Sequence, residues 1–234
     1  MVIKEAIILA GGLGTRLRSA VPDLPKCMAP VNGKPFLTYV IDHFRRERVT
    51  HFIFSLGYKS EAIIAFLQKD FPSLSFATSI EEEPLGTGGA VKKALAMAKE
   101  KSVLIANGDT FYNIDIELLA GIHSISGSCC TLSLKPMRNF DRYGVVEIDE
   151  CSVIKSFKEK KFYESGLING GIYALHRTKF LEENLPEKFS FEKDYLEKFY
   201  KKTRMFGLVQ DEYFIDIGIP EDYERAQGEI EMSG

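Results

Sequence analysis

Short apolar runs alternate with segments of helical periodicity through the first half of this sequence. In chain order, the apolar runs are EAIILA, HFIFSL, LSFATSI and KSVLIAN. The segments between them are PFLTYVIDHFRRERV, KSEAIIAFLQKDF and GTGGAVKKALAMAKEK. Continuous apolar runs of this length are typical of strands buried on both faces, and an intervening helix returns the chain to begin a parallel neighbour. The pattern predicts an α/β fold: a Rossmann-like, three-layer mixed sheet, mostly parallel, with helices on both faces.

The second half of the sequence loses this alternation after Asp109. Strand patterns follow one another with few helices between them: GSCCTLSLKP, YGVVEID, SVIKSF and LINGGIYALH. We expect these strands to add antiparallel partners at the sheet edge. Two helical segments near residues 179–183 and 191–201 follow, then the strands FGLVQ and YFIDIG and a helix that starts at the proline of PEDYERAQGEI. Because there is no internal repeat, linker or low-complexity tract, residues 1–234 are expected to form a single domain.

Composition and charge exclude several classes of partner. With 45% hydrophobic and 27% charged residues the chain can bury a core, and its net charge of −3 gives no general affinity for nucleic acid. No segment approaches the roughly 18 apolar residues of a membrane helix, and the N-terminal apolar run is shorter than that of a signal peptide. The four cysteines show no C-x-x-C spacing, so we expect reduced thiols in a cytoplasmic protein rather than a zinc site.

The stretch AGGLGTRLRSAVPDLPK, directly after the first apolar run, brings three glycines close to two arginines and a lysine. It contains no G-x-x-x-x-G-K-[ST] string, which excludes a P-loop. As a dinucleotide fingerprint it carries Leu17 where the third glycine belongs, and the second apolar run does not end on an acid. A bare backbone lets amide hydrogens approach an anion, and Arg16 and Lys26 add charges suited to phosphate. We favour phosphate binding over the alternative of a tight turn with solvated arginines.

The same stretch resembles the signature G-G-x-G-T-R-L-x-P-L-T-x-x-x-P-K of sugar-phosphate nucleotidyltransferases, also called nucleoside-diphosphate-sugar pyrophosphorylases. Further blocks resemble this family in the same order: EEEPLGTGGAVKKA, NGDTF, YGVVEID, SFKEKKF, INGGIY and FIDIGIPEDYERA. Enzymes of the family join a nucleoside triphosphate to a sugar 1-phosphate and release pyrophosphate. The chain departs from the signature at RSAVPD and at Cys27, and no C-terminal β-helix domain is expected.

The resemblance implies a role for residues in each of these blocks. The catalytic residues that it implies are Arg16, Lys26 and Asp109. Those implied to bind the nucleotide are Leu9, Gly11, Gly12, Gly14, Thr15, Glu81, Gly86 and Thr87. Those implied to bind the sugar phosphate are Tyr143, Gly144, Glu159, Lys160, Asn169 and Gly171. A solvated charge cluster is the alternative for Glu159 and Lys160, and bulge-marking strand glycines are the alternative for Gly144 and Gly171.

Asp109 and Asp216 are the residues that the resemblance assigns to the metal cofactor, Mg²⁺. Each is expected at the end of a strand, and in parallel sheets ligands bind beyond the carboxyl ends of the strands. Two carboxylates that converge there repel each other and raise one pKa unless a cation lies between them. Carboxylates together with triphosphate oxygens suit Mg²⁺. The alternatives are a turn residue at Asp109 and an exposed loop acid at Asp216.

Glu81 precedes a helix start that is rich in glycine, PLGTGG. The resemblance places Glu81 at the edge of the base, and we expect the three glycines to let a flat ring approach the backbone. A carboxylate only accepts hydrogen bonds, and guanine offers two adjacent donors where uracil and thymine offer one. GTP is therefore the favoured nucleotide, against the alternative that these residues form a solvated acidic turn.

The choice of sugar comes from resemblance alone. The stretches that resemble the GTP- and heptose 1-phosphate-using branch of the family are EEEPLGTGGAVKKAL, NFDRYG, GLINGGIYAL, EKFSFEKDYL and YFIDIGIPEDY. We expect in-line attack of the sugar phosphate on the α-phosphorus. The attacking phosphate needs no protein nucleophile or general base, because with a second pKa of about 6 it is largely ionised at pH 7. The alternatives are another nucleotide and sugar pair, a non-catalytic GDP-sugar-binding regulator and a nicotinamide-dependent oxidoreductase. The sequence leaves the oligomeric state open, with a homodimer among the states that it allows.

Overall fold

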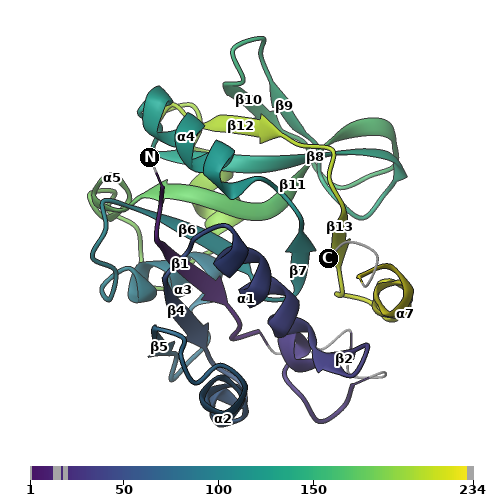
Figure 1. The fold of residues 1–234 in the computed structure, drawn as a ribbon. Coiled ribbons are helices and arrows are strands. Elements are labelled where there is room, and N and C mark those ends of the chain that lie inside the picture. The colour runs from purple at the N-terminus through teal and green to yellow at the C-terminus, as the bar shows by residue number, and fades with distance from the viewer. Residues whose placement is uncertain (1, 13–16, 18–20, 231–234) are drawn as a thin grey trace.

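A seven-stranded mixed sheet forms the centre of the molecule (Figure 1). The computed structural model describes residues 2–12, 17 and 21–230. The strand order is β12-β8-β11-β6-β1-β4-β5. The strands that the first half of the chain contributes are β1 (Glu5–Leu9), β4 (His51–Leu56), β5 (Phe76–Ile80) and β6 (Ser102–Asn107). These four strands are mutually parallel, as the alternation of strand and helix patterns predicts.

The second half of the chain extends the sheet beyond β6. It contributes β8 (Cys130–Phe140), β11 (Tyr163–His176) and β12 (Phe206–Val209). Strand β11 runs antiparallel to both β6 and β8, whereas β12 runs parallel to β8. The expected antiparallel addition is therefore confirmed for β11 and β8, which pair antiparallel with each other beyond β6, whereas β12 forms the edge with a parallel pairing.

Two further predicted strands do not join the main sheet. β9 (Val146–Ile148) and β10 (Ile154–Phe157) form a separate antiparallel ribbon, so the prediction that both extend the sheet edge as full strands is wrong. One antiparallel bridge, between Val153 and Phe206, links the ribbon to the edge strand β12. At the start of β10 the backbone N–H of Ile154 donates to the carbonyl of Met205 at 3.0 Å, and Val146 and Ile154 are buried on the ribbon's inner side. The ribbon lies beside β12 and β8 (Figure 1).

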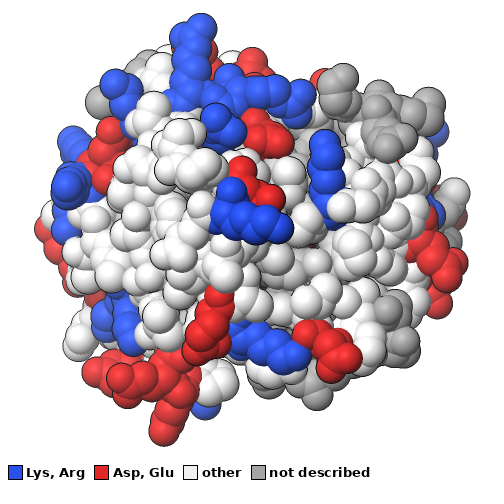
Figure 2. All heavy atoms as spheres, turned by 60° about the horizontal axis from the view of Figure 1, so that its bottom comes forward, with Lys and Arg blue, Asp and Glu red and all other residues white. Residues whose placement is uncertain are grey.

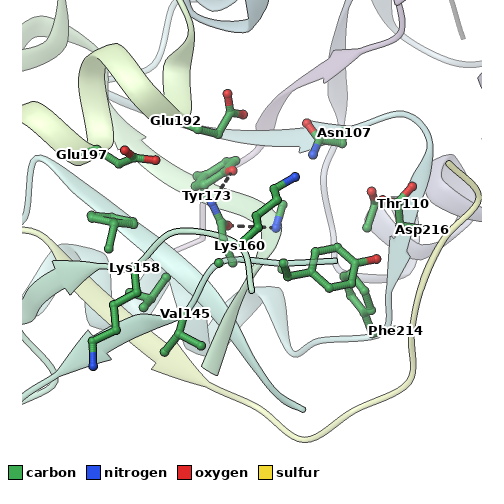
Figure 3. A pocket seen from close by; sticks show the side chains of 17 residues that line it. Asn107, Thr110, Val145, Lys158, Lys160, Tyr173, Glu192, Glu197, Phe214 and Asp216 are labelled. Carbon is green, nitrogen blue, oxygen red and sulfur yellow. Dashed lines mark hydrogen bonds between the residues drawn. The ribbon is translucent and has the colours of Figure 1, made fainter. Parts of the chain in front are cut away.

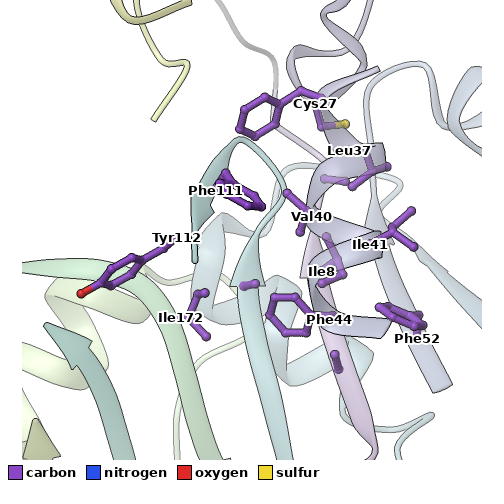
Figure 4. Close-up of a cluster of buried hydrophobic side chains, with 14 of the residues drawn as sticks. Ile8, Cys27, Leu37, Val40, Ile41, Phe44, Phe52, Phe111, Tyr112 and Ile172 are labelled. Carbon is purple, nitrogen blue, oxygen red and sulfur yellow. The ribbon is translucent and has the colours of Figure 1, made fainter. Parts of the chain in front are cut away.

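Helices cover both faces of the sheet. Those that contribute to one hydrophobic cluster are α1 (Phe36–Arg46), α2 (Ser60–Asp70), α4 (Ile116–Ser126) and α7 (Pro220–Glu229). Those on the other face are α3 (Gly86–Ala94), α5 (Arg177–Leu181), the π-helical turn η3 (Phe191–Leu196) and α6 (Glu197–Phe199). Neighbouring strand residues alternate between the two clusters: Ile8 packs with the first and Ile7 with the second. Figure 4 shows the first cluster, where Ile8 lies between α1 and the sheet.

Sequence reasoning missed α4 and three short strands. Asp115 caps α4, because its Oδ1 accepts a hydrogen bond of 2.7 Å from the backbone N–H of Leu118. The missed strands are β2 (Pro30–Val31), β3 (Lys34–Pro35) and β7 (Thr110–Tyr112). The strand β13 (Phe214–Asp216) was expected, but its pairing with β7 in a second ribbon was not. No described helix is long and apolar enough to cross a membrane. Figure 2 shows acidic and basic side chains mixed on the face at the bottom of Figure 1.

Candidate active site

The ribbon of β7 and β13 brings together two acids that are far apart in the sequence. Asp109 lies just beyond β6 and directly before β7, and β13 pairs antiparallel with β7 so that Asp216 is opposite Thr110. The backbone N–H of Ile217 donates to the carbonyl of Asp109 at 3.1 Å, which extends this pairing. Asp109 and Asp216 thus converge, as the assignment of both to one metal site requires.

Lys26 lies between the two carboxylates. Its Nζ is 2.5 Å from Asp109 Oδ2 and 3.3 Å from Asp216 Oδ1. The lysine side chain is only 12% exposed, against 33% for Asp109 and 22% for Asp216. Burial lowers the pKa of Lys26, but the two aspartates outweigh burial and hold that pKa above its usual value. Lys26 is therefore a fixed cation at this point of the site.

The electrostatics of Asp216 favour a bound cation. Burial and the nearby Asp109 raise the pKa of Asp216 above its usual value, although Lys26 and Arg142 act in the opposite direction. Hard carboxylate oxygens in this environment fit a divalent cation such as Mg²⁺. Within the described ranges no group of three or more His, Cys, Asp or Glu side chains could hold a metal. The remaining ligands of such an ion would come from phosphate oxygens and water.

A cavity of about 660 Å³ opens beyond the carboxyl ends of β1 and β4. Its lining includes Leu9, Gly11, Gly12, Glu81, Gly86, Thr87 and Asp109 from the predicted residues, together with Ser55, Gly57, Tyr58, Glu82, Glu83, Pro84, Ala90, Asn107 and Glu192. All the described residues predicted to bind the nucleotide line it. Gly14, Thr15 and Arg16 lie outside the residues that the structure describes.

Glu81 is held at the wall of this cavity by the protein itself. Its Oε2 accepts a hydrogen bond of 2.9 Å from the backbone N–H of Leu85, and its Oε1 accepts a longer one of 3.4 Å from Ser55. A Cβ added at Gly11 would lie 3.1 Å from Glu81 Oε1, so a glycine at position 11 leaves room for this carboxylate. The structure therefore fixes where Glu81 presents its acceptors.

The glycines of the α3 helix start serve a different purpose from the one expected. Gly88 and Gly89 are buried against residues 187–189, and both backbone N–H groups donate to the carbonyl of Phe189. Side chains at these positions would collide with the Phe189 ring and with the Glu187 carbonyl, respectively. The expectation that all three glycines admit a flat ring is wrong for Gly88 and Gly89, because protein already occupies that space. Gly86 does line the cavity.

A second cavity, of about 260 Å³, lies between β11, the β9–β10 ribbon and η3 (Figure 3). Of the residues predicted to bind the sugar phosphate, those that line it are Tyr143, Gly144, Lys160, Asn169 and Gly171. Glu159 is not among its lining residues. Lys160 comes from the loop after β10, and among the described residues it has no carboxylate partner within salt-bridge distance.

The protein fixes the wall of this second cavity through Asn169. Its Nδ2 donates to the Tyr173 hydroxyl at 2.9 Å, and its Oδ1 accepts from the backbone N–H of Gly171 at 3.1 Å. Gly171 has a φ of +76°, and the pairing of β11 with β8 shifts register between Asn169 and Tyr173. A bulge at Gly171 therefore exists, and the same bulge forms part of the cavity wall.

The two cavities meet at the acidic pair. Asp109 lines the first and Asp216 lines the second, and Lys26 bonds to both. Asn107 and Glu192 belong to the lining of both cavities. Sequence reasoning did not select either residue, although Asn107 lies in the block NGDTF and Glu192 in the stretch EKFSFEKDYL, both of which resemble the family. A group in one cavity can therefore approach a group in the other beside Lys26.

A glycine-rich turn after β1, two acids at a strand end and two adjoining cavities define a phosphate-handling site on an α/β sheet. The sequence model of one family, described as nucleotidyl transferase, matches residues 5–233. This chain belongs to the nucleotidyl transferase family. The expectation drawn from the sequence blocks is thus confirmed.

Individual relatives cover nearly the whole chain. The chain is 47% identical over 227 residues to D-glycero-alpha-D-manno-heptose 1-phosphate guanylyltransferase of Aneurinibacillus thermoaerophilus, across 97% of this chain and 98% of that protein. It is 46% identical over 219 residues to the protein of the same name from Campylobacter jejuni, across 94% and 96% of the two chains. Among solved structures, HddC from Yersinia pseudotuberculosis complexed with GMP-PN matches with a TM-score of 0.86 and 39% identity, over 97% of this chain and all of that one.

Proposed function

We propose that this protein joins GTP to D-glycero-α-D-manno-heptose 1-phosphate, giving GDP-heptose and pyrophosphate. The observation that carries the proposal is the meeting of two cavities at Lys26, Asp109 and Asp216. The similarity to two heptose 1-phosphate guanylyltransferases over nearly their full length supports the choice of substrates. We further propose a cytoplasmic location, which suits a protein with four free cysteines.

The chemistry needs no protein nucleophile. An oxygen of the sugar 1-phosphate attacks the α-phosphorus of GTP in line with the bond to the leaving group, a new P–O bond forms, and pyrophosphate departs with the electron pair of the broken bond. The attacking phosphate is largely ionised at pH 7, since its second pKa is about 6. The protein's contribution is to hold two anions in one geometry and to stabilise the charge that shifts between them.

The residues of the first cavity hold the nucleotide in this proposal. The backbones of Gly11 and Gly12 approach the triphosphate, and Arg16 adds a two-pronged donor to its oxygens. Glu81, held by Leu85 and Ser55, accepts from the adjacent donors on the guanine edge. A base with a single donor there would make one contact in place of two, which favours guanine.

The junction supplies the charge stabilisation. Asp109 and Asp216 would hold Mg²⁺, which when bound neutralises and orients phosphate oxygens. Lys26, already fixed between these acids, places one positive charge beside the reacting phosphates. Lys160, without a carboxylate partner among the described residues, binds the phosphate of the sugar. Tyr143, Gly144, Asn169 and Gly171 surround the sugar ring, and Glu159 stays a candidate for a sugar hydroxyl.

A substrate matrix tests this proposal. Pyrophosphate release is measured for four nucleoside triphosphates against heptose, mannose and glucose 1-phosphates, with and without Mg²⁺. The highest kcat/KM is expected for GTP with the heptose, and only with Mg²⁺. A preference for another pair would keep the reaction type and correct the substrates, whereas binding of GDP-heptose without turnover of any pair would identify a regulator.

A further inference from the structure

Glu192 occupies a position that the proposed function does not use. It lies in η3, a segment from the last third of the chain, and its side chain belongs to the lining of both cavities. Figure 3 shows it at the margin of the sugar cavity, with Glu197 from the following helical turn and Tyr173 from β11 nearby. A side chain at this point can contact the nucleotide, the sugar phosphate or both.

The carboxylate of Glu192 is oriented by two hydroxyl groups from different elements. Its Oε2 accepts a hydrogen bond of 2.7 Å from Thr87 Oγ1 in α3 and one of 2.9 Å from Ser190 Oγ before η3. Thr87 Oγ1 is itself fixed, because it accepts from the backbone N–H of Phe191 at 2.9 Å. Both contacts fall on one oxygen, and no described residue donates to Oε1. One carboxylate oxygen is therefore anchored while the other is left as an acceptor.

The residues around Glu192 indicate which kind of ligand group can bind to it. No lysine or arginine among the described residues lies within salt-bridge distance, so the negative charge is not neutralised by the protein. Glu197 lines the sugar cavity on the same side, and Glu192 contributes to raising the pKa of Glu197. The two carboxylates disfavour a phosphate at this wall, while Lys26 lies at the acidic pair and Lys160 enters the same cavity from the loop after β10. A hydroxyl group, which can donate to a carboxylate, is the ligand group that fits.

We propose that Glu192 is a specificity residue that accepts a hydrogen bond from a ligand hydroxyl where the two cavities meet. The proposal rests on the function proposed above, in which both ligands carry hydroxyls: the ribose of the nucleotide and the ring of the sugar 1-phosphate. A fixed charged acceptor strengthens such a bond, and a ligand that lacks the hydroxyl leaves an oxygen of this partly buried residue without that partner. Glu192 then favours ligands that bear a hydroxyl at this position over their deoxy analogues.

Deoxy analogues test the proposal and identify which ligand supplies the hydroxyl. Wild-type protein, Glu192→Ala and the control Glu61→Ala, an exposed residue of α2, are compared with GTP, 2′-deoxy-GTP and 3′-deoxy-GTP, and then with mono-deoxy analogues of the sugar 1-phosphate. We expect wild type and Glu61→Ala to prefer one hydroxylated ligand about 10- to 100-fold in kcat/KM, and Glu192→Ala to lose that preference. If the preference is lost for the nucleotide analogues, the ribose supplies the hydroxyl; if it is lost for the sugar analogues, the sugar 1-phosphate supplies it.

Two further measurements separate this role from a structural one. Glu192→Gln keeps an oxygen that can accept from Thr87 and Ser190 but loses the charge, so an intermediate preference is expected with an unchanged melting temperature. Calorimetric binding of each ligand and its deoxy analogue gives the same comparison without turnover. If the wild type releases no pyrophosphate, the proposed function is wrong. The binding comparison still tests whether Glu192 sets the preference for a hydroxylated ligand. Equal preferences in wild type and Glu192→Ala for every analogue would overturn the inference.

Discussion

At the scale of single residues, the acidic pair lowers the stability of the fold, because Asp216 is buried next to a second carboxylate. Asp216 is buried beside Asp109, and these two causes outweigh the attraction of Lys26 and raise the pKa of Asp216. A carboxyl whose folded pKa exceeds its unfolded value of about 3.9 makes the folded state less stable as pH rises through that interval. The ionised form of Asp216 thus lowers stability at neutral pH.

Replacing Asp216 with asparagine should separate stability from activity. The amide removes the buried charge and retains an oxygen that can accept from Gly218. We expect a melting temperature equal to or above that of the wild type at neutral pH, with the difference vanishing near pH 3, and a loss of pyrophosphate release of at least about 100-fold. Thermal melts over a pH series and a turnover assay check both parts. A lower melting temperature at neutral pH would contradict this account of the pair.

Removal of Lys26 should have the opposite effect on stability. Lys26→Ala leaves two carboxylates without their shared cation, and we expect a loss of about 1–3 kcal/mol at pH 7.5, less than for a fully buried pair because Asp109 is partly exposed. The pKa of Asp216 then rises further, so protonation near pH 5 should recover part of the loss. Urea unfolding at the two pH values measures it. The exposed pair of Lys198 and Asp194 supplies a control, since Lys198→Ala should change stability by less than about 0.5 kcal/mol.

At the scale of secondary-structure elements, the sequence predicts strands that have their own apolar pattern, but it does not predict contacts between strands that are far apart in the chain. The strands β1, β4, β5 and β6 follow from apolar runs that carry their own signal. The ribbon of β7 and β13 does not, because its two strands are short and more than a hundred residues apart. The acids at its end were found through a family motif, but their convergence on Lys26 depends on this pairing. The role of Glu192 likewise depends on Thr87, a residue 105 positions away.

The helix start of α3 gives an element-scale prediction with an internal control. Gly89 lies against the carbonyl of Glu187, and a Cβ there would also approach Leu85 Cβ to 2.8 Å. We expect Gly89→Ala to lower stability by about 1–3 kcal/mol through overpacking. Gly121, inside α4, has open space around it, and Gly121→Ala should raise stability by about 0.5–1 kcal/mol. Chemical denaturation measures the free energy of unfolding of both variants. Equal changes in the two would exclude close packing as the reason for glycine at position 89.

At the scale of the whole molecule, each half of the chain contributes most of one cavity, and the site exists only where the halves meet. The first half supplies most of the wall of the first cavity, with Asp109, whereas the second half supplies most of the wall of the second cavity, with Asp216. One continuous sheet joins them through the antiparallel pairing of β11 with β6. That residues 1–234 form a single domain stays a prediction, which unfolding experiments can test.

Ligand binding should stabilise the molecule as one unit. With a non-hydrolysable GTP analogue and Mg²⁺ at 100 times the dissociation constant, we expect about 2.7 kcal/mol of stabilisation and a rise in melting temperature of about 5–11 °C. Calorimetry should show a single transition with and without ligand. Two transitions, with only one shifted by the ligand, would show that the halves unfold as separate domains.

The most direct test of the account measures where the chemistry takes place. Pyrophosphate release from GTP and D-glycero-α-D-manno-heptose 1-phosphate is followed for the wild type, Asp109→Asn and Asp211→Asn, the last removing an exposed acid that pairs with Lys135. We predict that the wild type and Asp211→Asn release pyrophosphate at similar rates and that Asp109→Asn is slower by at least about 100-fold while remaining folded. Wild-type turnover by Asp109→Asn would show that the reaction does not occur at the junction of the two cavities.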